Sequence, residues 1–209
     1  MAAIRGLYAV TPDCTDTASL LHKVEAAIAG GARLVQYRNK SATEALRCEQ
    51  ALALANLCRR RGVLFIVNDS VELATQAGAD GVHLGAGDGS VPEARRRLGD
   101  GKIVGASCYG ALSNALEAQR AGAGYVAFGS FFASSVKPGA ARAPVALLTE
   151  AKRAIGIPVV AIGGITPENA QQLIAAGADA VAVISALFDT ADVEAAARRF
   201  SQLFHEQTQ

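Results

Sequence analysis

The chain has 209 residues, of which 51% are hydrophobic and 5% aromatic, and its formal net charge is +1. This length and apolar content predict a single domain over residues 1–209 with one substantial core. Because the charge is nearly balanced and tryptophan is absent, the chain offers neither a basic surface nor an aromatic stacking platform, and we expect no nucleic-acid ligand.

Signals for export or membrane insertion are missing from the sequence. Residues 1–10 enter an apolar run directly and lack the layout of a signal peptide. Gly163, Gly164 and Pro167 interrupt the most apolar region, so no apolar stretch reaches the roughly 18 residues of a membrane span. We therefore expect a cytoplasmic protein that does not insert into membranes.

The four cysteines, Cys14, Cys48, Cys58 and Cys108, form no CxxC pair. Two of them, Cys48 and Cys58, fall within one expected helix. We expect all four to be free thiols, and Cys108 to be a small buried hydrophobe rather than a group that lines a pocket.

In chain order, short apolar runs alternate with helical patterns along the whole sequence. The apolar runs predict strands over Leu7–Val10, Leu34–Arg38, Leu64–Asn68, Val82–Leu84, Ile103–Ser107, Tyr125–Gly129, Val159–Ile162 and Ala180–Ile184. The segments between them predict helices over Leu20–Ala29, Thr43–Arg61, Val71–Ala77, Val91–Leu98, Ala111–Ala121, Val145–Ile155, Pro167–Ala176 and Asp192–Glu206. Strict alternation of strands and helices is typical of a parallel sheet.

A repeated turn supports the same count of units. Gly30, Gly78, Gly122 and Gly177 each follow an alanine-rich helical stretch and precede an apolar strand, as expected of glycines that end helices in the left-handed conformation. The spacing suits two βα units per repeat, which makes eight units and favours a closed (β/α)8 TIM barrel. A doubly wound open sheet is the alternative, but no GxGxxG follows the first strand.

Polar residues gather at the carboxyl ends of the expected strands, where barrel enzymes place their chemistry. If the strand beginning at Leu34 continues through Lys40, then Gln36, Arg38 and Lys40 lie on one face. One amide and two cations at the end of a buried strand predict a clamp for a phosphate or diphosphate. The alternative is a strand that runs into solvent with its charges exposed.

Two carboxylates follow the next strands. Asp69 and Asp88 near these cations predict an oxygen-ligated Mg²⁺ that completes its shell with water and a substrate phosphate. Asp69 could instead cap the following helix, although Ser70 is a good N-cap, and Ser90 leaves Asp88 free of that task. We expect His83 to be a packed, hydrogen-bonded barrel residue rather than a zinc ligand.

The last strands predict an anion site. Gly163 and Gly164 follow a strand and precede a Thr-Pro helix start, where backbone N–H groups meet the positive end of the helix. Ile184 and Ser185, after the final strand, would supply further N–H donors.

In order, the motifs are QYRNK (36–40), VNDS (67–70), GVHLGxxD (81–88), GAS (105–107), YVAFGSFF (125–132) followed by Lys137, AIGGIT (161–166) and VAVISA (181–186). Together they resemble the thiamine-phosphate synthase family over essentially the whole chain. The resemblance implies a barrel that joins a hydroxymethylpyrimidine diphosphate to a thiazole phosphate, giving thiamine phosphate and diphosphate with Mg²⁺. Small phosphorylated molecules are then the partners, and association into a homo-oligomer stays open.

The resemblance also implies roles for individual residues. It implies contacts to the pyrimidine diphosphate from Gln36, Arg38, Lys40, Asn68, Ser107 and Lys137, with Ser107 and Lys137 as the catalytic pair. It implies that Asp69 and Asp88 hold the metal, and that Gly164, Ile184, Ser185 and the hydroxyl of Ser134 bind substrate on the thiazole side. Such chemistry needs no activated nucleophile, and the sequence has no GxSxG or Ser-His-Asp arrangement.

Two positions depart from the family pattern. Ala86 stands where the family has Gln, and Val136 stands where a second hydroxyl is usual beside Ser134. The pyrimidine and diphosphate half of the site is therefore nearly complete, whereas we expect the departures to bear on the affinity for thiazole phosphate or on the thiazole accepted.

Three alternatives stay open. A barrel like thiazole tautomerase would not need the metal and diphosphate set, which this chain retains. A phosphate-binding isomerase or aldolase would need a general base or Schiff-base lysine on a strand, but Lys40 and Lys137 lie at or beyond strand ends. A third alternative is a non-catalytic barrel that binds thiazole phosphate for regulation. Only an activity assay can distinguish such a barrel from an enzyme.

Overall fold

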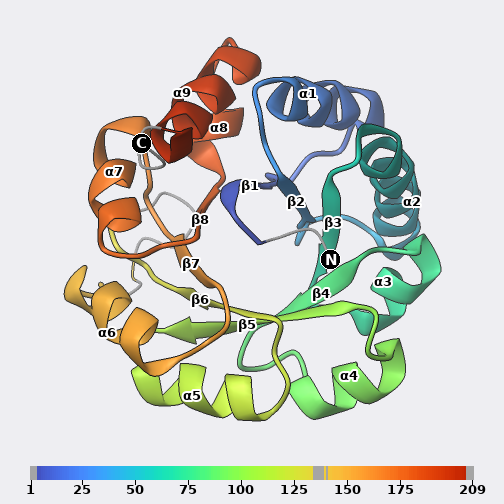
Figure 1. The fold of residues 1–209 in the computed structure, drawn as a ribbon. Helices are drawn as coiled ribbons and strands as arrows, with labels where there is room; N and C mark the ends of the chain where they lie inside the picture. Colours follow the sequence, from blue (N-terminus) through green and yellow to red (C-terminus); the bar gives the residue numbers. More distant parts are fainter. Residues whose placement is uncertain (1–3, 134–138, 140, 206–209) are drawn as a thin grey trace.

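Eight parallel strands close into a barrel in chain order, from β1 to β8 and back to β1, and the helices surround it (Figure 1). The computed structural model describes residues 4–133, 139 and 141–205. The strands are β1 Gly6–Val10, β2 Leu34–Tyr37, β3 Leu64–Asn68, β4 Gly81–Leu84, β5 Ile103–Tyr109, β6 Tyr125–Phe128, β7 Val159–Ile162 and β8 Ala180–Val183. The closed (β/α)8 barrel is confirmed, and the open-sheet alternative is wrong.

The helices lie between the strands in the predicted order. They are α1 Thr17–Ala29, α2 Glu44–Arg61, α3 Val71–Ala77, α4 Val91–Leu98, α5 Leu112–Arg120, α6 Ala146–Ala154, α7 Pro167–Ala175, α8 Ser185–Phe188 and α9 Val193–His205. The four-residue helix α8 was not predicted, because it follows β8 directly and is too short to show a helical period.

The core has two layers, as barrels of this fold require. One lies between the strands and the helices, and it buries the outward side chains of the sheet. The other fills the barrel itself and includes Tyr8, Leu34, Ile66, Tyr125 and Val160. Because strands covered on both faces read as continuous apolar runs, the strands were the easiest elements to predict.

Strand β2 ends at Tyr37 instead of continuing through Lys40. Beyond Tyr37, the backbone N–H of Arg38 donates to Thr11 Oγ1 (2.8 Å), and that of Lys40 donates to Asp13 Oδ1 (3.1 Å). Side chains of the β1–α1 loop thus accept these backbone N–H groups in place of the carbonyls of a neighbouring strand. The chain therefore leaves the sheet. The expected strand face shared by Gln36, Arg38 and Lys40 is therefore wrong.

All four cysteines are free, as predicted. Cys58 and Cys108 are buried in the outer core layer, and burial raises the pKa of each thiol to about 12. Both are therefore protonated at neutral pH and act as small hydrophobes.

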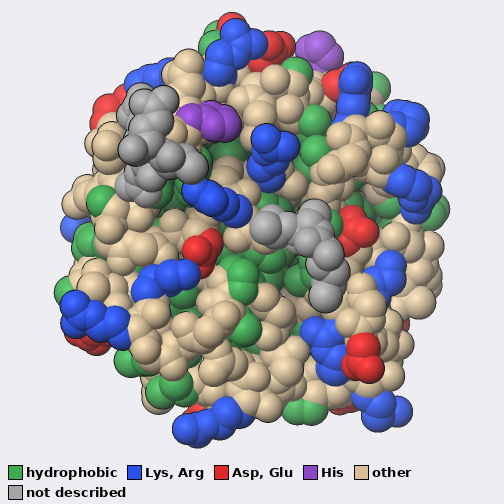
Figure 2. All heavy atoms as spheres, in the orientation of Figure 1, with side chains coloured by type: hydrophobic (Ala, Val, Ile, Leu, Met, Phe, Trp, Pro, Cys, Tyr) green, Lys and Arg blue, Asp and Glu red, His purple; other side chains and the backbone are tan. Residues whose placement is uncertain are grey.

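The molecular surface fits the balanced composition. On the face shown in Figure 2, basic side chains are scattered around the rim, with acidic side chains between some of them, and they do not merge into one continuous patch. Within the described ranges, no helix combines the length and apolarity that crossing a bilayer requires.

Three of the four repeated turns have the predicted left-handed glycine, at Gly78, Gly122 and Gly177. At the first turn, Gly30 is helical (φ −75°) and the left-handed position is Gly31 (φ +103°). Gly30 is instead required by close packing, since a Cβ there would lie 2.4 Å from the carbonyl oxygen of Glu194 in α9. Because Gly30 has no side chain, α1 and α9 can pack closely beside β1 and β8, the two strands whose pairing closes the barrel.

We predict that Gly30→Ala lowers the free energy of unfolding by about 1–3 kcal/mol, because backbone atoms of α9 cannot yield to the new methyl group. Urea denaturation measures the change. Gly101→Ala is the matched control, since a Cβ at Gly101 meets nothing within 4 Å. Equal stability of the two variants would contradict the packing role.

Candidate active site

A cavity of about 350 Å³ opens at the carboxyl ends of the strands. Strand ends and the loops behind them supply its lining, with apolar walls and polar groups that converge on the interior. Of the residues singled out from the sequence, those that line it are Gln36, Arg38, Asn68, His83, Ser107, Gly163, Gly164, Ile184 and Ser185. Lys40, Asp69 and Asp88 are not among its lining residues. Ser134 and Lys137 lie outside the described residues.

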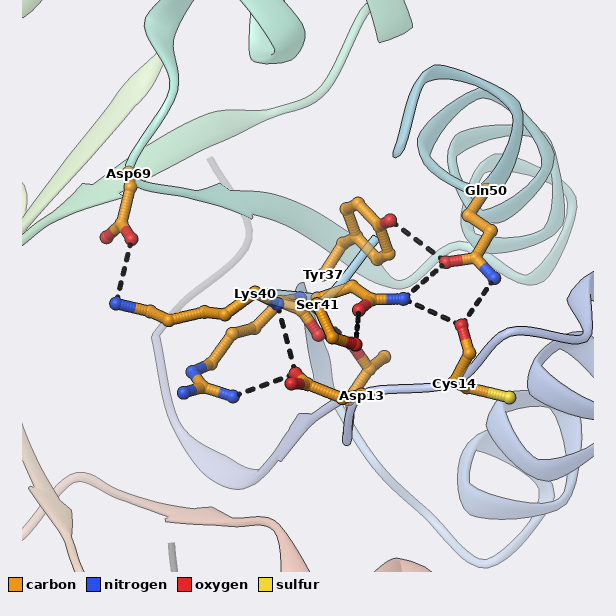
Figure 3. A network of polar contacts seen from close by, with 10 residues as sticks. Asp13, Cys14, Tyr37, Lys40, Ser41, Gln50 and Asp69 are labelled. Atoms are coloured by element: carbon orange, nitrogen blue, oxygen red, sulfur yellow. Dashed lines mark hydrogen bonds and ion pairs between the residues drawn. The ribbon is translucent and has the colours of Figure 1, made fainter. Parts of the chain in front are cut away.

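The two cations of the β2–α2 loop are held by carboxylates of the chain (Figure 3). The Arg38 guanidinium lies 3.2 Å from Asp13 Oδ1, and the Lys40 ammonium lies 3.4 Å from Asp69 Oδ2. Arg38 is largely buried and lines the cavity, whereas Lys40 is half exposed and reaches away from β2 toward the β3 end. The two charges thus sit at different parts of the site, each with its own counter-charge.

A buried amide network fixes the loop that carries these cations. The side chain of Gln50, 0% exposed on α2, accepts from the Tyr37 hydroxyl (2.9 Å) and from Asn39 Nδ2 (3.1 Å). Gln50 Nε2 and Asn39 Nδ2 both donate to the carbonyl of Cys14, at 3.0 and 2.7 Å. Because these bonds are shielded from water, the β1–α1 and β2–α2 loops behave as one unit.

Asp69 occupies a strained backbone position at the end of β3. Its φ of +66° is left-handed, and its N–H donates to the His83 carbonyl at 2.8 Å. Left-handed non-glycine residues cost free energy and concentrate at functional sites. The hydroxyl of Ser70 caps α3, so the capping alternative for Asp69 is wrong.

Asp88 lies beside Asp69 in the turn after β4. Its Oδ2 accepts the N–H of Gly85 at 2.9 Å, and Ser90 caps α4 as predicted. Burial first, and then the neighbouring Asp88 carboxylate, raise the pKa of Asp69, while Lys40 acts in the opposite direction. Two crowded carboxylates are a donor set that suits a divalent cation.

The carboxylate pair could supply only part of a metal ligand set. In the described part of the chain, no three His, Cys, Asp or Glu side chains gather into a complete ligand set. Mg²⁺ commonly takes one or two carboxylates and fills its remaining positions with water and phosphate oxygens. The residues present therefore fit Mg²⁺ and do not fit a fully protein-ligated metal.

The glycine loop after β7 brings backbone close to the cavity. Gly163 (φ +103°) and Gly164 (φ +64°) are both left-handed, and a Cβ on Gly164 would lie 2.2 Å from the Ala133 carbonyl oxygen. Asn169 and Thr166 form a capping box at the start of α7, and Asn169 also donates to the Gly164 carbonyl. This loop and the start of α8 form the part of a barrel that binds phosphate in many enzymes.

Polar side chains that bond to one another form the floor of the cavity. Gln36 Nε2 donates to the Tyr8 hydroxyl, which bonds to the Tyr125 hydroxyl. That hydroxyl contacts His83 Nδ1, and His83 Nε2 contacts Ser107 Oγ, every distance being 2.8 Å. We call these five residues the floor relay. The prediction that His83 is a packed barrel residue is confirmed.

Several residues at the site gave no clear signal in the sequence. Tyr8 and Tyr125 read as apolar strand residues, and Asp13, Asn39 and Gln50 read as loop or helix surface. A polar glutamine among the buried positions of α2 is the one trace that pattern analysis could have used. Tyr109 also borders the cavity, with a left-handed backbone (φ +53°) and a hydroxyl that accepts the Ala86 N–H at 3.2 Å.

Fold and cavity together define a (β/α)8 barrel of the enzyme type, in which polar groups converge where the parallel strands end. A family model described as thiamine monophosphate synthase matches residues 7–187. The chain belongs to the thiamine monophosphate synthase family.

Individual relatives match over nearly the full length. A thiamine-phosphate synthase of Thiobacillus denitrificans is 60% identical over 199 residues, covering 95% of this chain and 94% of that protein. One of Methylobacillus flagellatus is 55% identical, covering 97% and 96%. The solved structure of thiamine phosphate pyrophosphorylase from Pyrococcus furiosus superposes with a TM-score of 0.86 at 34% identity, covering 96% of each chain.

We predict that Asp88→Asn makes the metal-free protein more stable at neutral pH. Burial and Asp88 raise the pKa of Asp69 above its ordinary 3.8, so protonated Asp69 favours folding. That contribution is present below pH 3.8 and is lost as the pH rises through the raised pKa. In Asp88→Asn the charge beside Asp69 is gone, so ionised Asp69 lowers the stability less at neutral pH. The side-chain oxygen of the asparagine can still accept the N–H of Gly85.

Thermal unfolding with a chelator present measures this effect. We expect the Tm of Asp88→Asn to exceed that of the wild type by about 1–3 °C at pH 7. The difference should shrink as the pH falls through the raised pKa of Asp69, where that carboxylate gains its proton. Asp100→Asn, at an exposed position away from the pair, is the control. A Tm gain that did not vary with pH would contradict the assignment.

Proposed function

We propose that this barrel is a thiamine-phosphate synthase that condenses 4-amino-2-methyl-5-hydroxymethylpyrimidine diphosphate with 4-methyl-5-(2-phosphoethyl)thiazole, giving thiamine phosphate and diphosphate, or with the carboxy form of that thiazole, which releases carbon dioxide as well. The observation that carries the proposal is a cavity lined by Arg38 and Asn68 on one side and by a glycine loop at helix starts on the other. Asp69, which follows Asn68 directly, pairs with Lys40 and neighbours Asp88. Those two features suit two phosphorylated substrates. The near full-length relatives carry the same name.

Each half of the cavity has its own substrate in this proposal. Gln36, Asn68 and Ser107 face the pyrimidine end, where Arg38, Lys40 and Lys137 would balance the diphosphate. The backbone of Gly164, Ile184 and Ser185, with the Ser134 hydroxyl, would bind the thiazole phosphate. We assign Ser107 and Lys137 the contacts made as the leaving group departs.

The reaction is a displacement at the methylene carbon of the pyrimidine. Its C–O bond breaks and the electron pair leaves with the diphosphate, while the thiazole nitrogen supplies the pair for the new C–N bond. The aminopyrimidine ring delocalises the positive charge that develops on that carbon. The protein therefore has to hold the two substrates in line and to stabilise the negative charge of the leaving group.

Charge balance in the free site prepares it for this ligand. Asp69 now neutralises Lys40, and Asp13 neutralises Arg38. Mg²⁺ held by Asp69 and Asp88 would supply positive charge to the departing diphosphate. If Asp69 held the metal, the Lys40 ammonium would be able to turn to a diphosphate oxygen.

We further infer that residues 1–209 form one domain that acts on small phosphorylated molecules in the cytoplasm. A single barrel runs through the described residues from β1 to α9, which supports the first part. A biosynthetic reaction on such charged intermediates suits an intracellular site, which supports the second.

We predict that the purified protein forms thiamine phosphate when given both substrates and Mg²⁺, and that a chelator abolishes the reaction. Product is measured by chromatography after oxidation to its fluorescent thiochrome derivative. Omitting either substrate is the control. Conversion of one thiazole isomer into another without condensation would indicate a tautomerase instead, and binding of thiazole phosphate without turnover would indicate a regulatory barrel.

We predict that Asp69→Asn and Asp88→Asn each lower kcat/KM by on the order of 10²-fold, because each removes charge that holds the metal beside the leaving group. The loss should be larger at limiting than at saturating Mg²⁺. Asp100→Asn, exposed and distant from the carboxylate pair, should retain wild-type turnover. Wild-type activity of both site variants at limiting Mg²⁺ would refute the metal assignment.

A further inference from the structure

The floor relay joins five strands into one hydrogen-bonded line beneath the cavity. Its members come from β2, β1, β6, β4 and β5, in the order Gln36, Tyr8, Tyr125, His83 and Ser107. Four of them line the cavity, whereas Tyr125 is 0% exposed and lies behind them. Any effect of the Tyr125 hydroxyl on a ligand therefore passes through its two neighbours.

The relay has a definite direction. A hydroxyl has one hydrogen to donate, and a neutral imidazole has one N–H. Gln36 donates to Tyr8, so Tyr8 donates to Tyr125, and Tyr125 donates to His83 Nδ1. His83 then carries its hydrogen on Nε2 and donates to Ser107 Oγ. In the reverse direction, the Tyr8 hydroxyl would accept hydrogens from both Gln36 and Tyr125. Its own hydrogen would then have no acceptor in the relay.

Burial maintains this direction. Desolvation is the largest cause that raises the pKa of both phenols, Tyr8 and Tyr125, so each retains its hydrogen at any physiological pH. The rings also hold one another in place: Tyr8 meets Tyr125 edge to face at 6.0 Å, and His83 stacks on Tyr125 at 5.5 Å.

The backbone leaves space for the central ring of the relay. Gly105 on β5 faces Tyr125, and a Cβ at that position would lie 2.1 Å from the ring. The smallest residue of the GAS motif (105–107) thus stands where Tyr125 crosses the strand, two residues before Ser107. The glycine and the tyrosine form one unit of packing.

We propose that the floor relay sets the hydrogen-bonding polarity of the cavity floor, with Gln36 presenting its amide oxygen as an acceptor and Ser107 its hydroxyl as a donor. Tyr125 is then a positioning residue that selects a ring carrying an amino donor beside a ring-nitrogen acceptor. This choice of ring rests on the proposed function, whereas the direction of the relay does not.

The direction is tested in the free protein by ¹⁵N NMR of the histidine side chains. We expect His83 to be neutral with its hydrogen on Nε2, and its signals are assigned by their loss in His83→Gln. In Tyr125→Phe, which keeps the ring against Gly105 but cannot donate to Nδ1, His83 should become a mixture of both tautomers. A hydrogen on Nδ1 in the wild type, or an unchanged tautomer in Tyr125→Phe, would overturn the proposal.

Tyr37→Phe is the matched control for that spectrum. It also deletes the hydroxyl of a buried tyrosine, but that hydroxyl donates to Gln50, which is outside the relay. The His83 signals should be the same as in the wild type. If they shifted to a mixture as well, general loosening of the core would explain the tautomer change, and Tyr125 would lose its assigned role.

Selectivity is tested by comparing kcat/KM for the aminopyrimidine diphosphate with that for an analogue whose amino group is replaced by hydrogen. We expect Tyr125→Phe to lower the wild-type preference for the amino compound about tenfold, the scale of one lost hydrogen bond. An unchanged preference would overturn the selectivity role. Absence of condensation in the wild type would instead refute the proposed function, and the tautomer result would still decide the direction of the relay.

Discussion

Closure of a parallel sheet is the constraint on which the rest of this structure depends. Every strand runs in the same direction, and β8 pairs with β1, so eight carboxyl ends meet around one rim. Loops far apart in the sequence are thereby brought to a single cavity without any long-range motif. The short helix α8 follows directly from this geometry, because the chain leaving β8 turns at the rim and places its first turn beside the glycine loop of β7.

The charges at this rim are arranged for a ligand rather than for stability. Asp69 adopts a left-handed backbone, is partly buried, and has the like-charged Asp88 as a neighbour. Each of these features opposes folding, and Lys40 offsets them only in part. Sites that bind charged substrates commonly carry such costs. Charges that were fully neutralised within the protein would gain little free energy from binding a ligand. The amide network around Gln50 fixes the neighbouring β2–α2 loop, from which Lys40 reaches Asp69.

The barrel interior shows a second departure from simple packing. Two tyrosines and a histidine occupy positions that aliphatic side chains could fill, and each polar atom has a partner in the relay. A buried line of this kind is tolerated only when it is fully connected, because a single missing bond leaves a desolvated donor or acceptor. Full connection also gives the line a direction, which neither an apolar floor nor a flexible polar one would have.

By itself, the sequence determined the strand and helix order, the closed barrel, the free cysteines, the packed His83 and the Ser70 and Ser90 caps. These follow from local periodicity, burial and capping, which act within a few residues. Only the tertiary structure decided where β2 stops, why Gly30 is glycine, and which carboxylate each cation meets. It alone revealed Asp13, Gln50, Tyr8 and Tyr125 at the site. Their partners lie up to 117 residues away in the chain, and a hydrogen bond between buried groups depends on their separation in space, of which sequence spacing carries no record.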